Sequence, residues 1–233
     1  AIKKNEAIRQ DCVANVSHEL RTPLTIMSGF LETIRDLPLS EEEKARYLDI
    51  MVTQSDRMLT LVDELLILTR LDSSPVSPKT RTVNLAEVFE RIMTDARSLS
   101  KGRHILTLRA SSHKYVLGSD NEIISAFGNL VNNAIRYSPE GGAILIDWSD
   151  LPDGGARFAV TDSGLGIAPE HIPRITERFY RVDLSRSRDT GGTGLGLAIV
   201  KHVAMRHQAE LRIESQIGQG SIFEIIFIKD RLV

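Results

Sequence analysis

His18 stands in helical sequence beside groups that can exchange protons with it. Glu19 follows directly and is an acid able to accept a ring proton, and Thr22 lies one helical turn further along on the same face. Neighbouring apolar side chains recur every three or four residues and form one stripe: Val13, Val16, Leu20, Leu24, Met27, Leu31 and Ile34. On the same helical count His18 lies nearly opposite that stripe. The sequence therefore predicts an imidazole that faces solvent or a visiting protein.

Pro23 places a defect next to this histidine. Proline has no N–H to give to the carbonyl of Glu19, so we expect the backbone to bend or loosen there. A His-Glu-x-x-His zinc site is excluded, because Thr22 stands where the second histidine would be needed. Taken alone, a surface histidine with no chemical role is the more common case.

A second group of polar residues lies on the helical stretch that ends at Tyr137. Asn129 and Asn133 are four residues apart, so their carboxamides project from one face. Two neutral amide oxygens would bind bare Mg²⁺ weakly, but they suit a metal that arrives with phosphate ligands. The face continues to Arg136, a candidate phosphate or ribose contact, and to Tyr137, whose ring could pack on a base. Without that continuation, two asparagines on a solvated helix would be ordinary.

An acid and two glycines follow the apolar strand sequence Phe158–Val160. Asp162 can accept a hydrogen bond from an exocyclic amine, while Gly164 and Gly166 let the backbone pass close to a ring. A simple turn would use the same residues, so this pattern alone leaves both interpretations open.

A glycine-rich segment then leads into an apolar helix. Free N–H groups at a helix N-terminus form an anion site suited to phosphates, and the residues concerned are Gly192, Gly194, Leu195 and Gly196. The segment is not a P-loop, because no Gly-Lys-Ser/Thr follows. It is not the dinucleotide fingerprint either, because Leu197 occupies the third glycine position.

Two long helices should position His18. The first is expected from near the start of the chain to about Asp36, and Ser40 with Glu43 forms a capping box that opens the second. The apolar stripe of the second helix is heptad-like: Tyr47, Met51, Gln54, Met58, Leu61, Leu65 and Leu68. Further apolar side chains widen both stripes beyond what one partner helix can cover: Ile26, Phe30, Leu48, Leu59, Val62 and Leu66. We therefore expect an antiparallel hairpin that forms a homodimeric four-helix bundle, with His18 on its outside.

The pattern changes after a polar stretch with two prolines, Leu71 to Thr82, which has linker composition. We expect a helical hairpin over residues 1–72, a linker over 73–82 and a second domain over 83–233. Strands are expected at 83–85, 105–108, 115–117, 143–148, 157–161, 210–215 and 221–228, with helices at 86–99, 120–137 and 195–207. These elements predict an α+β two-layer sandwich.

Composition excludes several classes of protein. The 233 residues carry a formal net charge of -2 with a pI near 6.4, which argues against a nucleic-acid binder. A single cysteine, Cys12, rules out an internal disulfide framework. No apolar run is long enough to cross a bilayer. The chain opens inside a helical pattern, so we expect the cytoplasmic portion of an inner-membrane protein, attached through an upstream segment.

Several motifs together resemble those of sensor histidine kinases. The run Ser-His-Glu-Leu-Arg-Thr-Pro-Leu at Ser17–Leu24 resembles their H-box. The stretches around Asn133, Asp162 and Gly194 resemble, in this order, the N-, G1- and G2-boxes of the ATPase domain that these kinases share with Hsp90-type chaperones, gyrases and mismatch-repair ATPases. Glu177–Arg181 resembles the kinase F-box. The surroundings of the histidine look most like those of phosphate-regulon sensor kinases.

This resemblance implies that the protein uses ATP to phosphorylate His18 and passes the phosphoryl group to an aspartate in the receiver domain of a response regulator. Glu19 would orient the imidazole, and Thr22 would position water for hydrolysis of the phospho-regulator. The residues implied at the nucleotide are Asp162 at the adenine amine, Asn133 and Asn129 at Mg²⁺, and a lid over Pro169–Thr190. Phe179 and Arg181 would steer this lid, and Arg181, Arg186 and Arg188 would screen triphosphate charge.

Two other hypotheses come from different classes of protein. An ATP-sensing dimer that phosphorylates nothing would have no need of the intact histidine, acid and asparagines. An ATPase of the chaperone or topoisomerase kind needs a catalytic acid on the N-box helix. Here both N-box positions are asparagine, and Glu122 lies about two turns earlier.

Overall fold

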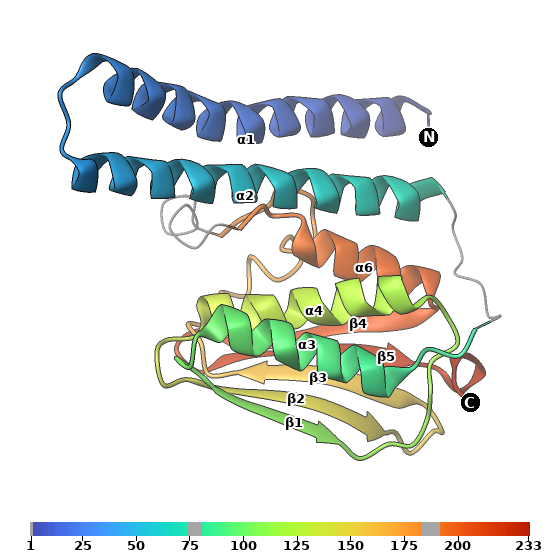
Figure 1. Cartoon of the computed structure of the whole chain (residues 1–233). Helices are drawn as coiled ribbons and strands as arrows, with labels where there is room; N and C mark the ends of the chain where they lie inside the picture. The colour runs from blue at the N-terminus through green and yellow to red at the C-terminus, as the bar shows by residue number, and fades with distance from the viewer. Residues whose placement is uncertain (1, 74–80, 183–191) are drawn as a thin grey trace.

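The computed structural model describes the backbone of residues 2–73, 81–182 and 192–233, with side chains from residue 14 onward. Two long helices, α1 (Ile2–Asp36) and α2 (Glu41–Ser73), form the predicted hairpin, which lies over an α/β part (Figure 1). The predicted capping box at the start of α2 is confirmed. The Ser40 N–H donates to the Glu43 carboxylate at 2.9 Å, and the Glu43 N–H donates to the Ser40 hydroxyl at 3.2 Å. Helix α1 continues without a break through Pro23.

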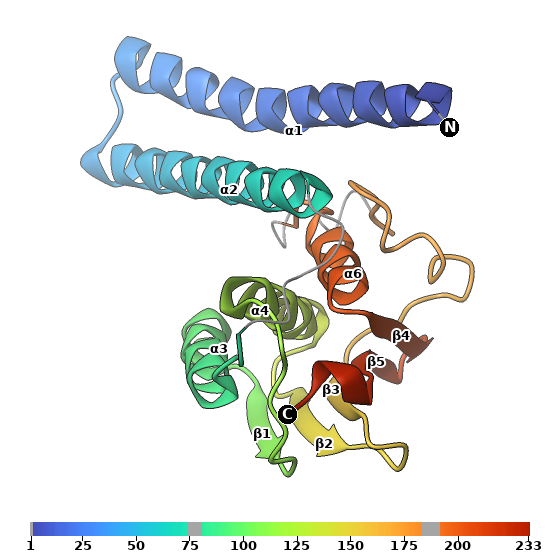
Figure 2. The ribbon, with the colours of Figure 1, turned by 90° about the vertical axis from the view of Figure 1, so that its right-hand side faces the viewer.

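The α/β part is a mixed five-stranded sheet with three helices on one face (Figure 2). Its sheet order is β1-β2-β3-β5-β4; β1 and β2 are parallel, and the other neighbours are antiparallel. The elements are α3 (Leu85–Ser100), β1 (Ile105–Ala110), α4 (Asp120–Tyr137), β2 (Ala143–Asp150), β3 (Ala156–Asp162), α6 (Gly196–Arg206), β4 (Ala209–Gln216), β5 (Gly220–Phe227) and the short 3-10 helix η1 (Lys229–Arg231). This arrangement confirms the predicted α+β two-layer sandwich.

Aromatic side chains between the helices and the sheet hold α4 in place. Phe127 of α4 stacks on Phe158 of β3 with ring centroids 3.6 Å apart, and both side chains are fully buried. Phe89 of α3 and Phe227 of β5 pack around this pair. Stacked aromatic rings of this kind add to the stabilisation from buried apolar area. Since α4 carries Asn129 and Asn133 on its other face, the packing fixes the direction in which these amides point.

Three sequence predictions were wrong in detail. Residues 83–85 and 115–117 are not strands. Only the isolated bridges Thr82–Leu117 and Val116–Leu232 form in this region, and Leu85 already begins α3 behind its cap, Asn84. The residues from Leu71 do not all belong to a linker, since α2 continues to Ser73. The physical reason is tertiary: the Leu71 side chain is buried at 4 % exposure and its carbonyl accepts a hydrogen bond from Arg206.

One surface of the hairpin stays apolar and open to solvent. On α2, Leu59 is 62 % and Leu66 is 51 % exposed, and on α1 Leu24 and Leu31 are about half exposed. A single hairpin therefore leaves much of its predicted stripes uncovered. Among the helices of the described residues, none has the length and apolar character needed to span a membrane.

Candidate functional site

His18 lies on the exposed side of α1, as its position opposite the apolar stripe predicted. The Glu19 carboxylate beside it forms an ion pair with Arg57 of α2, with an N–O distance of 3.1 Å. The Thr22 hydroxyl donates to the His18 carbonyl at 3.3 Å, which keeps it on the same face as the imidazole. The hairpin thus presents an accessible imidazole with a held carboxylate and a hydroxyl next to it.

The carboxylate of Asp162 is buried at the end of β3, with 7 % of the residue exposed. One of its oxygens accepts the Gly164 N–H at 2.8 Å, and the Ser221 N–H also bonds to it. Burial raises the pKa of Asp162 despite these two donors. A Cβ at Gly164 would lie 2.6 Å from both this carboxylate and the Tyr137 carbonyl. The structure therefore brings Asp162, Gly164 and Tyr137 together, and only glycine fits between them.

The glycine-rich turn at the start of α6 is tightly packed. Gly194 has a φ of +75°, and a Cβ there would lie 2.9 Å from the backbone of Phe179. The Phe179 N–H donates to the Gly194 carbonyl at 2.9 Å. The Thr193 hydroxyl accepts the Leu195 N–H at 3.2 Å, close to the helix N-terminus. The backbone from residue 192 to Gly196, which we call the phosphate turn, has the N–H groups and the helix dipole that favour an anion.

Residues of α4 face this turn. A Cβ at Gly196 would lie 2.5 Å from the Asn129 side-chain oxygen, and one at Gly192 would lie 3.2 Å from the Arg136 guanidinium. The Asn129 amide nitrogen donates to the Ser125 carbonyl at 2.9 Å, which leaves the oxygen directed toward the turn. Hard amide oxygens fit Mg²⁺. Within the described residues no three carboxylate, histidine or cysteine side chains gather into a metal site, so a metal here would depend on ligands brought by a nucleotide.

Arg181 interacts electrostatically with residues beside His18 and with residues beside the phosphate turn. Its guanidinium is attracted by Glu19 beside His18 and repelled by Arg136 beside the phosphate turn, and burial lowers its pKa. Among the described residues, none forms a hydrogen bond with its buried Nε and Nη2 atoms. This buried cation is suited to an anionic group between the hairpin and the phosphate turn. Gly166, by contrast, packs against the Gln216 carbonyl, and the predicted lid residues Arg186 and Arg188 lie outside the described residues.

The hairpin contacts the α/β part directly through α2, which lies between α1 and α6 (Figures 1 and 2). The buried side chains of α2 are Leu61, Leu68 and Leu71. At the end of α2, the Asp72 carboxylate accepts two hydrogen bonds from Arg178, at 2.8 and 2.9 Å. Nearer the middle, the Thr193 hydroxyl donates to the carboxylate of Glu64. Sequence reasoning missed Glu64 and Asp72, because on a helical count they look like ordinary solvated residues.

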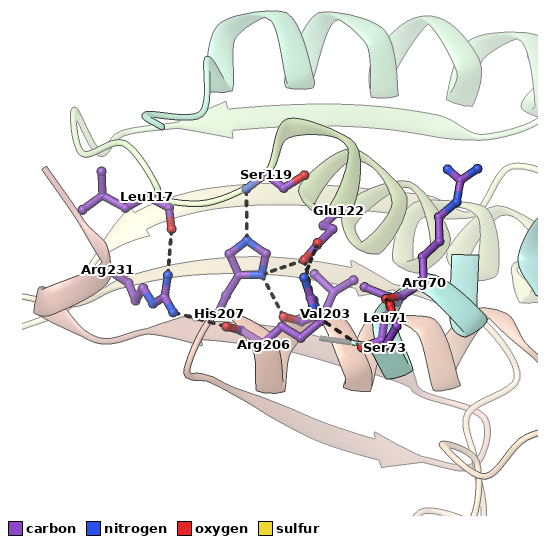
Figure 3. Close-up of polar contacts among 10 residues, drawn as sticks. All are labelled: Arg70, Leu71, Ser73, Leu117, Ser119, Glu122, Val203, Arg206, His207 and Arg231. Atoms are coloured by element: carbon purple, nitrogen blue, oxygen red, sulfur yellow. Dashed lines mark hydrogen bonds and ion pairs between the residues drawn. The ribbon is translucent and has the colours of Figure 1, made fainter. Parts of the chain in front are cut away.

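Glu122 takes part in a buried polar cluster where α4 and α6 meet (Figure 3). Both of its carboxylate oxygens accept hydrogen bonds from Arg206, at 2.9 and 3.1 Å, and His207 lies 3.7 Å away. Arg206 also donates to the Leu71 carbonyl at 3.4 Å. Glu122 is therefore occupied in holding α2 and α4 to α6 and is poorly placed to activate water. This observation weakens the chaperone-type ATPase hypothesis.

Two family models match the chain. Residues 8–74 match the His Kinase A (phospho-acceptor) domain, and residues 118–231 match the histidine kinase-, DNA gyrase B- and HSP90-like ATPase family. These two ranges contain His18 and the phosphate turn respectively.

Known proteins resemble most of the chain. The phosphate regulon sensor protein PhoR of Pseudomonas aeruginosa is 47 % identical over 224 residues, which are 95 % of this chain and 50 % of PhoR. The sensor-like histidine kinase SenX3 of Mycolicibacterium smegmatis is 40 % identical over 94 % of this chain and 57 % of SenX3. The structure of full-length ShkA in complex with AMPPNP matches with a TM-score of 0.66 and 25 % identity, over 93 % of this chain and 45 % of that one.

The chain thus spans about half the length of the curated relatives it matches. Within that span it carries a phospho-acceptor domain followed by an ATPase domain, in the order that its motifs predicted. This chain belongs to the sensor histidine kinases.

Proposed function

We propose that the protein transfers the γ-phosphoryl group of ATP to His18 and then to an aspartate of a response-regulator receiver domain. The single observation that carries this proposal is an exposed imidazole on α1, next to Glu19, in a chain that also has a glycine-rich turn at the start of α6 suited to phosphate. We also propose that the chain divides into a hairpin over residues 1–72, a linker over 73–82 and a catalytic domain over 83–233.

The residues around the phosphoacceptor support nucleophilic attack by a ring nitrogen of His18. A free imidazole is largely neutral near pH 7, so it can attack phosphorus. Glu19 can take the proton from the other nitrogen, which keeps the ring oriented. The Arg57 guanidinium holds that carboxylate in place.

Residues of the catalytic domain have complementary roles in this proposal. Asp162 accepts a hydrogen bond from the adenine amine, Tyr137 packs on the base, and the turn with Gly192, Gly194, Leu195 and Gly196 binds phosphates. Asn133 and Asn129 would hold Mg²⁺, which when bound would supply positive charge against the phosphates. Arg136 and Arg181 stabilise the transferring phosphoryl group, and Phe179 ties the lid to the turn. ShkA, a protein of the same fold, was solved in complex with AMPPNP, which agrees with nucleotide binding by this chain.

The exposed apolar side chains of the hairpin support a homodimer. Burying half-exposed leucines on both helices against a second hairpin would stabilise the pair by roughly 25 cal/mol for every Å² of apolar surface removed from water. The dimer would leave His18 accessible, because it lies off the apolar stripe. A receiver domain can then dock on that outer face.

The reverse activity, hydrolysis of phospho-aspartate on the regulator, fits Thr22. Its hydroxyl lies on the face of His18 and can position water. The 47 % identity to the phosphate regulon sensor PhoR makes phosphate availability the signal that we propose. In this proposal the chain works as the cytoplasmic portion of an inner-membrane sensor.

Autophosphorylation is tested with labelled ATP and Mg²⁺. Label bound to the protein should be labile to acid and stable to base, as phosphohistidine is, and His18→Gln should abolish it while ATP affinity and dimerisation persist. Glu32→Gln, at an exposed position of α1, is the control and should keep full labelling. Label that remains on the His18 variant would overturn the assignment.

A further inference from the structure

Glu64 of α2 reaches across the domain boundary to the phosphate turn. Its carboxylate accepts the hydroxyl hydrogen of Thr193, a residue of that turn with 6 % exposure. The same threonine hydroxyl accepts the Leu195 N–H at 3.2 Å, next to the first turn of α6. Glu64 is thus joined, through one hydroxyl, to the backbone that would bind phosphate.

The surroundings of Glu64 do not neutralise its charge by direct pairing. Among the described residues no lysine or arginine is paired with it in a salt bridge, although Arg136 attracts it from a longer range. Burial is the largest influence on this carboxyl and raises its pKa. In its ionised form this carboxylate is a concentrated negative charge, hydrogen-bonded to the turn that would bind phosphate.

A nucleotide phosphate and this carboxylate would compete for the same groups. Both are anions, both are attracted by Arg136, and both suit the Thr193 hydroxyl and the helix N-terminus. Like charges a few Å apart in a partly buried site repel strongly. Each added phosphoryl group brings more negative charge to the turn, so the conflict grows from adenosine to ADP to ATP.

We infer that Glu64 is a specificity-determining residue that weakens binding of ATP relative to ADP and adenosine while α2 is docked on α6. This inference rests on the proposed nucleotide site and adds to it a graded response to phosphate number. A nucleotide with more phosphates must displace Glu64, and the displaced carboxylate loosens the contact between the hairpin and the catalytic domain. The rest of the contact, at Leu68, Leu71 and Asp72, does not involve Thr193.

The test measures affinities of the full chain for adenosine, ADP and ATP by calorimetry. Glu64→Gln keeps the shape of the side chain and removes its charge. We expect the variant to bind ATP about tenfold more tightly than the unsubstituted chain, ADP by a smaller factor, and adenosine without change. Omitting Mg²⁺ should steepen the series, because the phosphates then carry their full charge.

Two control variants separate the charge effect from other causes. Asp63→Asn removes the same charge at the neighbouring exposed position and should change none of the three affinities. Asp72→Asn weakens the docking of α2 at a point away from Thr193 and leaves Glu64 in place, so it should raise the affinity for ATP most and for adenosine least, by smaller factors than Glu64→Gln. Small-angle scattering gives a second readout: ATP should expand the unsubstituted protein, and adenosine should not.

Equal affinity gains for all three ligands with Glu64→Gln would show that Glu64 only holds the interface, which would overturn the inference. No gain for ATP would overturn it as well. In both cases the nucleotide site would stand, because the unsubstituted protein still binds ATP. Failure of the unsubstituted protein to bind either nucleotide would overturn the proposed function itself and the inference with it.

Discussion

Replacing Asp162 with asparagine should separate nucleotide affinity from folding stability. The two side chains have the same shape, so the packing at the end of β3 is kept. The Gly164 N–H, which donates to the carboxylate at 2.8 Å, can still donate to the amide oxygen of asparagine. This bond directs the amide nitrogen toward the place proposed for the adenine amine. In the variant, the amide N–H group and the adenine amine are both donors, so the hydrogen bond that the carboxylate would accept is not formed.

The expected loss follows from leaving one buried hydrogen bond unmade. Such a loss costs about 1 to 3 kcal/mol, which corresponds to roughly fivefold to 150-fold in the dissociation constant. The pyrimidine nucleotide CTP, whose exocyclic amine would lie elsewhere, is a useful control ligand and should lose less. Calorimetry with ATP and Mg²⁺ measures both constants.

The asparagine variant should bind ATP more weakly but should be no less stable to unfolding. Burial raises the pKa of Asp162, so the native state binds a proton more tightly than the unfolded state does. The free energy of unfolding therefore falls as pH rises from the unfolded pKa through the higher native one, and this loss remains at neutral pH. The asparagine variant lacks that titration. Without nucleotide at pH 7, its melting temperature should equal or exceed that of the unsubstituted chain.

The combination of weaker ATP binding and undiminished stability is what an adenine contact predicts. A variant that melts at a lower temperature and loses affinity for ATP and CTP alike would refute the reasoning, because Asp162 would then be a structural residue. Unchanged ATP affinity would refute it more directly.

The other variants act on the phosphoacceptor and the phosphate turn. Thr22→Ala should keep most autophosphorylation but slow hydrolysis of the phospho-regulator by about tenfold to a hundredfold, because one positioned hydrogen bond is lost. Equal effects on both activities in parallel assays would contradict this. Arg57→Leu removes the ion-pair partner of Glu19, which should lower the unfolding free energy by about 1 kcal/mol. It should also reduce kcat for autophosphorylation without raising KM for ATP, and a rise in KM alone would disprove this. Gly194→Ala forces a Cβ to 2.9 Å from the Phe179 backbone at a φ of +75°. It should lower the unfolding free energy by about 1 to 2 kcal/mol in thermal melts and weaken the affinity for ATP at least tenfold in calorimetry.

The sequence predicted most elements because their signals are local. Helix α4 begins at Asp120 and ends at Tyr137, the bounds expected from its apolar periodicity and flanking residues. The capping box at Ser40 also lies within four residues of chain. The two misplaced strands show the limit of such signals: a few β-prone residues form a strand only if a neighbour continues the ladder, and at Thr82 and Leu117 the ladder is one pair long.

The contacts between the two parts could not be predicted, since they join residues far apart in sequence. Glu19 and Arg57 are separated by 38 positions, and Glu64 and Thr193 by 129. Each of these charged residues satisfies the pattern of a solvated helix face equally well. Motif resemblance selected Asp162 and Asn133 as candidates, but it says nothing about an acid whose role depends on how two domains dock.

Two consecutive residues of the predicted lid link the phosphate turn to the hairpin. Arg178 binds the Asp72 carboxylate of α2, while the next residue, Phe179, donates its N–H to the Gly194 carbonyl of the turn. Phe179 also has a φ of +63°, a conformation that a bulky residue adopts only when its surroundings require it. A displacement of the turn by a bound phosphate therefore acts on Phe179, and through the adjoining peptide on Arg178 and Asp72. Since Glu64 also binds this turn, through Thr193, α2 is connected to the proposed nucleotide site at two points, and a ligand that moves the turn must change both.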